Sequence, residues 1–284
     1  MKSRGAPIWW VRSTTATSLA LAVLAGPAGL MSASPALAGG ADRLLREAVE
    51  AAGLGERSAS EIATACDGDP LCTAHAIADV LGPKVRVLTV DHPESDTIRL
   101  AETAPSLTGS APVGVGGLRL RLDHFGRKAE WEIGAAVLGA GPHVTRIELD
   151  LRGNAGGDFG RMLRVAALFT GPRNDALYID SAEGRESHAI PAPVLALPPR
   201  ALIVLIGPGT ASSAEVLAAL LRRHAGARLL GERTRGKDWL LRLVAVDHDH
   251  RLALPVGTLH IPDENLGNGV RPDGPVTDTL KPDS

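Results

Sequence analysis

Aromatic residues are scarce in this sequence, at 3% of 284 residues. Proteins that bind single-stranded nucleic acids stack the bases on aromatic side chains, and those that bind duplexes carry a basic face. The second feature is missing too, because 30 lysines and arginines are offset by 32 aspartates and glutamates. The composition therefore argues against a nucleic-acid partner.

Cysteine is also rare, and Cys66 and Cys72 are the only two. They flank the Asp-Gly-Asp-Pro sequence at 67–70, which predicts a turn. An oxidising, exported compartment would allow a disulfide across this turn, and the alternative is a pair of buried thiols. With only His75 nearby and no second cysteine pair, the spacing does not fit a zinc site.

No apolar run is long enough for a good membrane span. The best candidate, residues 19–30, is short and interrupted by glycine and proline. It follows a basic start and precedes Ala-Leu-Ala at 36–38, which is typical of a cleaved secretory signal peptide; an uncleaved anchor is the alternative. We therefore expect a periplasmic or secreted protein with no stable membrane span. Loss of three basic residues and no acidic ones would take the net charge from −2 to −5.

The sequence predicts four parts along the chain. They are a signal peptide at 1–38, a small helical cap region at 39–83, connecting strands and a linker at 84–116, and a core domain at 117–284. In the third part we expect strands at 85–90 and 97–100, followed by a Gly-, Ser- and Pro-rich linker or mobile loop at 105–117.

Strands and helices alternate in the predicted core domain. Strands are expected at 118–122, 144–151, 201–206, 227–231, 241–246, 252–255 and 258–261, and helices at 129–138, 159–169 and 213–224. This order predicts βαβ units, hence an α/β fold with a largely parallel sheet. Such sheets present their chemistry at the carboxyl ends of the strands.

Two reactive side chains follow predicted buried strands. Ser212 comes after strand 201–206, and Lys237 comes after strand 227–231. A neutral lysine can activate a serine as a nucleophile, so the pair predicts a Ser/Lys hydrolase. The alternatives are that Ser212 only caps the next helix and that Lys237 is an ordinary exposed lysine.

A pair of glycines, Gly156 and Gly157, lies between a predicted strand and a predicted helix. Glycines there let backbone N–H groups point at a ligand, so one of the two could donate to an oxyanion; the alternative is a tight turn. The pattern does not match a phosphate-binding P-loop.

His248 and His250 alternate with aspartates and favour a polar hairpin turn, although the sequence leaves a metal cluster or a Ser-His-Asp triad open.

Five segments together resemble the C-terminal processing peptidases, also called tail-specific proteases. Residues 149–157 are similar to LDLRGNPGG of that family, 209–216 to GSASASEI, 231–237 to GEKTFGK, 267–273 to GKGIEPD and 118–125 to YIRISSF. The segments occur in the family's order and span about residues 117–276. Each motif alone is weak, but their common register is specific.

The resemblance implies a crotonase-like (Clp protease/crotonase) α/β core, a polypeptide substrate and no cofactor or metal. It also implies Ser212 as nucleophile, Lys237 as general base, and an oxyanion hole formed by the N–H groups of Ser213 and Gly156. Two departures affect this site: Leu241 replaces a glutamine that orients the lysine amine, and Asp238 replaces a glycine.

We therefore expect an exported serine endopeptidase that processes protein C-terminal tails. About 35 residues separate the predicted cap region from the first core strand, too few for the family's usual PDZ domain, so a PDZ-lacking member is expected. Two other functions remain open: a non-catalytic peptide-binding or scaffold protein, and a Ser/Lys esterase or amidase. The sequence is compatible with oligomerisation.

Overall fold

The computed structural model describes residues 40–92, 103–195, 197–198 and 200–276. The expected signal peptide at 1–38 and the expected strand at 97–100 lie outside these residues. Within the described ranges, none of the helices has both the length and the apolar character needed to cross a bilayer.

A five-stranded sheet contributes to the main hydrophobic core, and its order is β2-β3-β4-β7-β8. Its strands are β2 (Leu107–Val113), β3 (Gly117–Leu122), β4 (Arg146–Asp150), β7 (Ala201–Ile206) and β8 (Arg228–Gly231). The last four are parallel, as the alternation of strands and helices predicts, and β2 is antiparallel to β3. The carboxyl ends of β3, β4, β7 and β8 therefore meet at one edge.

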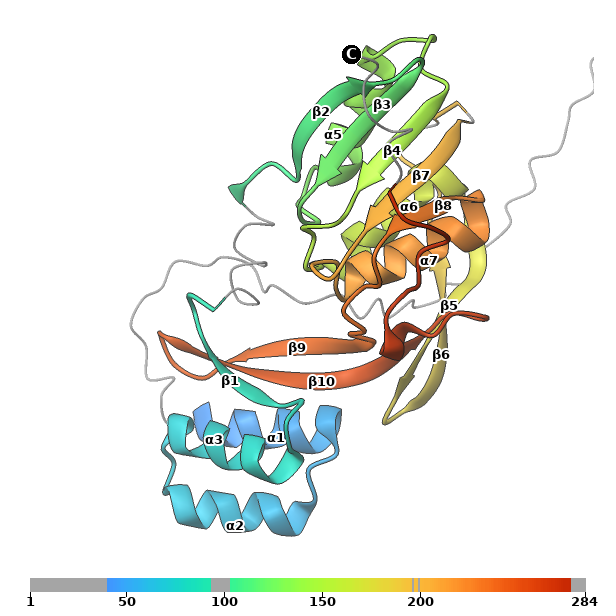
Figure 1. Ribbon diagram of the computed structural model, residues 1–284. Coiled ribbons are helices and arrows are strands. Elements are labelled where there is room, and N and C mark those ends of the chain that lie inside the picture. Colours follow the sequence, from blue (N-terminus) through green and yellow to red (C-terminus); the bar gives the residue numbers. More distant parts are fainter. Residues whose placement is uncertain (1–39, 93–102, 196, 199, 277–284) are drawn as a thin grey trace, which may run out of the picture.

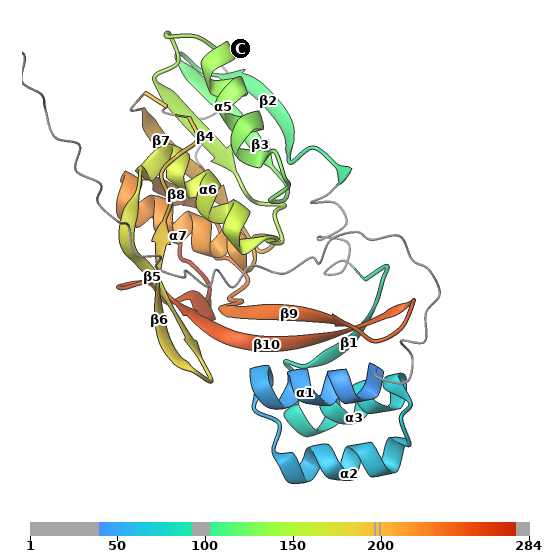
Figure 2. The ribbon, with the colours of Figure 1, turned by 180° about the vertical axis from the view of Figure 1, so that it is seen from behind.

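Three helices cover one face of this sheet (Figure 2). They are α5 (Ala129–Gly139), α6 (Phe159–Thr170) and α7 (Ser213–Ala225). The Asp158 side chain caps α6 by accepting from the Arg161 N–H group at 2.7 Å, which satisfies one of the donors left unpaired at a helix start. α7 is buried from Ser213 to Leu221, so it is the helix most enclosed by the core.

The β2 edge of this first sheet differs from the prediction. The expected linker at 105–117 contains β2, which pairs with β3 from Leu107 opposite Leu122 to Val113 opposite Gly117. Glycine, serine and proline are tolerated there because only one side of an edge strand needs its hydrogen bonds. The predicted alternation in β3 is confirmed, since its leucines are buried while its arginines are not.

A second, antiparallel sheet has the order β1-β10-β5-β6, and β9 also pairs with β10. Its strands are β1 (Arg86–Thr89), β5 (Arg173–Ser181), β6 (Gly184–Ile190), β9 (Trp239–Ala245) and β10 (His250–His260). The two strands predicted at 252–255 and 258–261 are one continuous strand, β10, with a register shift between Pro255 and Gly257. The β5–β6 hairpin was not predicted.

Three N-terminal helices pack against the β1 and β10 side of the second sheet (Figure 1). They are α1 (Gly40–Ala52), α2 (Glu56–Cys66) and α3 (Pro70–Leu81), and they confirm the helices predicted in this region. Their apolar faces share a buried cluster with Val244, Val246, Leu252 and Leu254 of the sheet. The helices are therefore packed onto the sheet through a hydrophobic core of their own.

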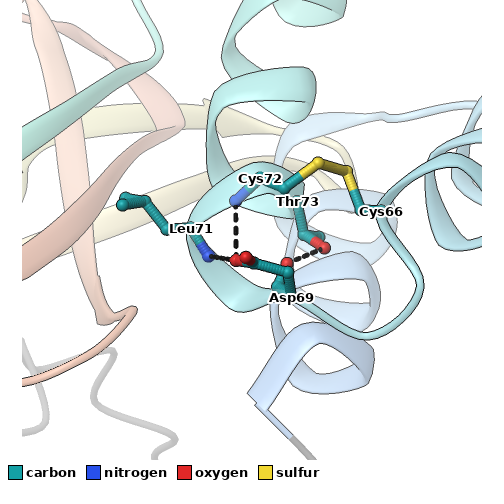
Figure 3. The surroundings of a disulfide bond; sticks show 5 residues. All are labelled: Cys66, Asp69, Leu71, Cys72 and Thr73. Carbon is teal, nitrogen blue, oxygen red and sulfur yellow. Dashed lines mark hydrogen bonds between the residues drawn. A yellow bond between two sulfur atoms is a disulfide. The ribbon is translucent and has the colours of Figure 1, made fainter.

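The turn between α2 and α3 contains the disulfide between Cys66 and Cys72 (Figure 3). The Asp69 carboxylate accepts hydrogen bonds from the Leu71 and Cys72 N–H groups at 2.8 and 3.0 Å, which caps α3. The Thr73 hydroxyl donates to the Asp69 carbonyl oxygen at 2.7 Å. The disulfide and the cap thus fix the same turn.

Candidate active site

Ser212 lies in a sharp turn between β7 and α7, where it is the N-cap residue of the helix. Its backbone angles are φ 55° and ψ −127°, and such a conformation costs a non-glycine residue about 1–3 kcal/mol. A strained strand-to-helix turn is one way in which a fold presents a nucleophilic serine. The Glu215 N–H donates to the Ser212 carbonyl oxygen at 2.8 Å, and Ser212 and Glu215 have the arrangement of a helix capping box.

The glycine turn after β4 packs directly against the serine turn. Gly156 has φ 107°, and a Cβ atom there would lie 2.9 Å from both the Ala211 carbonyl oxygen and the Ser212 Cβ. The Ser213 hydroxyl donates to the Gly157 carbonyl oxygen at 2.9 Å. The structure thus brings together three of the four residues that the sequence assigns to the site.

Asn154 fixes the glycine turn through hydrogen bonds of its side chain and its backbone. Its buried side chain donates to the Leu122 carbonyl oxygen at 3.1 Å and accepts from the Gly156 N–H at 2.8 Å. Its own carbonyl oxygen accepts from the Ala211 N–H at 3.1 Å. The Gly156 N–H, one of the two expected oxyanion donors, is therefore hydrogen-bonded within its own turn.

Lys237 lies in the loop after β8, and this loop rests on the serine turn. The Arg235 N–H donates to the Thr210 carbonyl oxygen at 3.1 Å, and the Gly236 N–H donates to Glu215 Oε1 at 2.6 Å. The Lys237 N–H donates to Glu215 Oε2 at 2.8 Å, and the lysine side chain is half-buried. The fourth assigned residue therefore lies in a segment held against the other three.

Trp239 provides a surface for two lysine side chains. The Lys237 Nζ lies 5.9 Å from the centre of its ring, and the Lys84 Nζ lies 4.7 Å from the same centre. Both distances fit a cation–π contact. Lys84 belongs to the segment between α3 and β1, so the indole connects the lysine loop with the N-terminal part of the chain.

The two residues that depart from the family pattern, Leu241 and Asp238, lie in β9 and in the loop before it. Leu241 lies within β9 opposite Pro255, and its apolar side chain has no group that could orient an amine. Asp238 packs against Gly267, where a Cβ atom would lie 2.6 Å from the aspartate Oδ2. The Asp238 carbonyl oxygen also accepts from the Leu259 N–H at 2.7 Å, which attaches the loop to β10.

The segment around residues 267–273 supports the lysine loop from the other side. The Thr234 N–H donates to the Val270 carbonyl oxygen at 3.2 Å, and the Val270 N–H donates to the Thr234 hydroxyl at 2.7 Å. The Asp273 carboxylate accepts from the Leu229 N–H of β8 at 2.8 Å. Residues 267–273 therefore help to fix the conformation of the lysine loop through these hydrogen bonds.

An ion pair closes the end of β4 next to the glycine turn. Arg152 donates from Nε and Nη2 to the Asp150 carboxylate at 2.9 and 2.6 Å. Burial alone raises the pKa of Asp150, but the hydrogen bonds and the positive charge of Arg152 outweigh it, so the pKa lies below its ordinary value. Asp150 is therefore a structural carboxylate that stays ionised, and it is unsuited to be a general base.

The His248 and His250 segment is a polar turn, as the sequence favours. Asp247 accepts hydrogen bonds from the backbone N–H and the ring Nδ1 of His250 at 2.8 and 2.9 Å. The turn lies at the far end of β9 from Lys237, which places it about 20 Å away along a seven-residue strand. Across the described parts of the chain, no group of three or more His, Cys, Asp or Glu residues could hold a metal ion.

Sequence reasoning assigned no role to Glu215, Thr234 or Asn154, although all three connect the turns of the site. Glu215 could have been found, because it follows Ser212 at the spacing of a helix capping box. Thr234 and Asn154 have no comparable local signal. Their importance depends on segments that are distant in sequence, namely residues 267–273 and the end of β3.

Known proteins resemble this chain in the region that contains the candidate site. The model of Peptidase family S41 matches residues 119–276, a range that contains the serine, lysine and glycine turns. A carboxyl-terminal-processing protease from Synechocystis sp. is 30% identical over 190 residues, which cover 64% of this chain and 43% of that protein. The chain thus spans less than half the length of this relative.

Two solved structures resemble the fold. A lipoprotein from Streptococcus agalactiae superposes with a TM-score of 0.67 at 13% identity, covering 89% of this chain and 96% of that one. A putative S41 protease from Bacteroides fragilis gives a TM-score of 0.50 at 16% identity, covering 61% of this chain and 51% of that one. At such identities the likeness establishes the fold alone.

Proposed function

The chain belongs to peptidase family S41, and from this premise we propose that it is a serine endopeptidase in which Ser212 is the nucleophile and Lys237 the general base. The single observation that carries the proposal is that one oxygen atom, Glu215 Oε2, accepts the N–H groups of both residues at 2.8 Å. The two backbone nitrogens therefore lie within twice that distance of each other. The side chains of Ser212 and Lys237 thus start from neighbouring points of the site, which supports a proton transfer between Ser212 Oγ and Lys237 Nζ.

The reaction would follow the usual course of covalent catalysis. The Lys237 amine removes the proton from Ser212 Oγ as the oxygen attacks the scissile carbonyl carbon. The resulting ammonium gives this proton to the leaving amine, and an ester of Ser212 remains. A water molecule, deprotonated by the same amine, then hydrolyses the ester and restores the free serine.

The oxyanion of each tetrahedral intermediate would be held by backbone donors. Ser213 begins α7, and the first N–H groups of a helix have no partner within it, so its N–H can point at the oxyanion. Gly156 is the second proposed donor, because no other residue fits so close to Ser212. For this purpose the Gly156 N–H would exchange its bond to Asn154 for one to the oxyanion.

The substrate would be an unfolded or C-terminally tailed polypeptide. The name of the Synechocystis relative supports this class, and the crotonase-like core proposed for the chain is compatible with it. Export to the periplasm or beyond is part of the proposal. It is supported by the apolar segment with its Ala-Leu-Ala sequence and by the Cys66–Cys72 disulfide, which is typical of an oxidising compartment.

A second candidate is a non-catalytic peptide-binding protein. Two observations favour it: Leu241 stands where an amine-orienting side chain is expected, and the Gly156 N–H is already bonded to Asn154. Retention of both Ser212 and Lys237 argues against it, since binding alone requires neither. An esterase or amidase with the same pair of residues would differ from the endopeptidase only in its substrate.

One assay separates these functions. The purified protein is incubated with unfolded proteins, tailed peptides and p-nitrophenyl esters beside Ser212→Ala and Lys237→Ala. We expect peptide cleavage that falls by at least about a thousandfold in either variant, as when one member of a catalytic unit is removed. Cleavage that survives both substitutions eliminates the Ser/Lys mechanism. Peptide binding without turnover supports the binding protein, and turnover of esters alone supports the esterase.

A further inference from the structure

Glu215 is a fully buried acidic residue in the first turn of α7. A buried carboxylate is unfavourable unless hydrogen bonds replace its hydration. The positive end of the helix favours a negative charge at this place, but by itself it accounts for only part of the compensation. The remainder must come from donors that point at the two oxygen atoms.

Four donors surround this carboxylate, two on each oxygen. Oε2 accepts from the Ser212 and Lys237 N–H groups, both at 2.8 Å. Oε1 accepts from the Gly236 N–H at 2.6 Å and from the Thr234 hydroxyl at 2.5 Å. One donor thus belongs to the serine turn, and three belong to the lysine loop.

We propose that Glu215 is a positioning residue that fixes the lysine loop relative to the nucleophile turn. This inference rests on the proposed function. Glu215 touches neither the substrate nor the reacting atoms. It acts through the backbone: bonds to an ionised acceptor are short and strong, so the carboxylate fixes both chain segments at one point.

Because Glu215 Oε2 accepts from both Ser212 and Lys237, the carboxylate links these two residues in particular. A carboxylate that only capped α7 would bind donors of its own helix turn, as Asp158 does at α6. Glu215 instead accepts three of its four hydrogen bonds from the lysine loop, which lies more than eighteen residues away in the sequence. Loss of its charge should therefore misplace the lysine loop and leave α7 itself folded.

The test compares Glu215→Gln with Glu148→Gln. Glu148 is equally buried and bonds Arg119 and Arg146 in the middle of β4, so its variant controls for loss of a buried carboxylate. Glutamine keeps the shape of Glu215 but turns one acceptor into a donor that faces two N–H or O–H groups. We expect kcat to fall about a hundredfold with KM within about threefold, the effect of a misplaced catalytic group. Glu148→Gln should keep the wild-type kcat.

Amide hydrogen exchange supplies a second measurement that does not depend on activity. In Glu215→Gln, exchange should accelerate in both 209–216 and 231–238, whereas Glu148→Gln should leave these segments protected. Faster exchange in 209–216 alone, or a kcat within about threefold of wild type, overturns the proposal. If wild type cleaves no substrate, the proposed function fails, while the exchange result still decides whether Glu215 joins the two segments.

Thr234→Val covers the case in which Glu215→Gln does not fold. It removes one donor to Oε1 and the acceptor of the Val270 N–H, and it keeps the carboxylate and the shape of the side chain. We expect kcat about tenfold lower, the value of about one hydrogen bond, with faster exchange confined to the lysine loop and to residues 267–273. A wild-type kcat together with wild-type exchange in Thr234→Val contradicts the positioning role.

Discussion

At the scale of single residues, the site depends on close approach and on strain. Ser212 holds a backbone conformation that few side chains adopt, and Gly156 lies so near that a single added carbon atom would collide with it. Both features persist because the surrounding hydrogen bonds, from Asn154 and Glu215, fix the two turns. Small changes at these positions should therefore affect catalysis more than stability.

Gly156→Ala tests this packing. The new Cβ would lie 2.9 Å from the Ala211 carbonyl oxygen and from the Ser212 Cβ, at a φ of 107° that alanine rarely adopts. We expect kcat/KM to fall at least about a hundredfold through displacement of the nucleophile, and stability to fall by about 1–3 kcal/mol.

The measurement is steady-state cleavage of an unfolded protein, together with thermal unfolding. Gly139→Ala is the matched control, because a Cβ at Gly139 would meet nothing within 4 Å. Wild-type activity in Gly156→Ala would show that the glycine turn does not form the wall of the site.

Local sequence signals select Ser212 and Lys237 as candidates, because each follows a strongly apolar strand and carries a recognisable chemistry. They were insufficient for Asn154 and Thr234, whose partners are distant in the chain. Glu215 is the intermediate case: its spacing from Ser212 signals a cap, but its bonds to the lysine loop exist only in the folded protein. Periodicity reveals which face is buried and cannot reveal which loops meet.

At the scale of secondary structure, the helices, the parallel strands and the antiparallel strands β1 and β9 follow from sequence patterns, while β2, β5 and β6 do not. The glycine, serine and proline residues of β2 are typical of loops and predict a linker, yet pairing with β3 stabilises the segment as a strand. The β5–β6 hairpin is mostly exposed on one strand, so it lacks an apolar signal. β10 was divided in two at its bulge near Pro255.

The ion pair at the end of β4 leads to a prediction about pH. The pKa of Asp150 lies below its ordinary value of 3.8 in the folded protein, so this residue stabilises the fold above that pH. The contribution is lost as the pH falls through the lower, folded-state pKa. Arg152→Met should therefore reduce the free energy of unfolding by about 1 kcal/mol at neutral pH, a value discounted for solvent screening.

Urea unfolding at a series of pH values measures this effect. The difference between wild type and Arg152→Met should be constant from neutral pH to about pH 4 and shrink below it. Arg185→Met is the control, since Arg185 pairs with the exposed Asp180 on the β5–β6 hairpin. A difference that grows as the pH falls would contradict the assigned sign.

At the scale of the whole molecule, β10 connects the parts. It pairs with β1, β5 and β9, and its buried residues contribute to the cluster beneath the N-terminal helices and to the main core. Lys84, from the segment that follows these helices, also contacts the ring of Trp239 beside Lys237. The N-terminal helices are therefore expected to unfold together with the sheet that carries the lysine loop.

Leu44→Asp tests this coupling. Leu44 is fully buried in the cluster beneath the helices, and a charge there is left without a partner. We expect a loss of at least about 3 kcal/mol and a single unfolding transition shifted to lower denaturant. Val80→Asp is the control, because Val80 is 54% exposed on α3. Separate transitions, with the one for the sheet unchanged, would refute the coupling.

The most direct test of the central claim is the rate at which Ser212 becomes acylated. An activated acyl compound or a cleavable peptide is mixed with wild type and with Lys237→Ala, and the adduct is located by mass spectrometry over a range of pH. We expect an adduct on Ser212 whose rate of formation rises with pH in wild type and loses that rise in Lys237→Ala. An adduct on another residue, or equal acylation of Ser212 in both proteins, would contradict it.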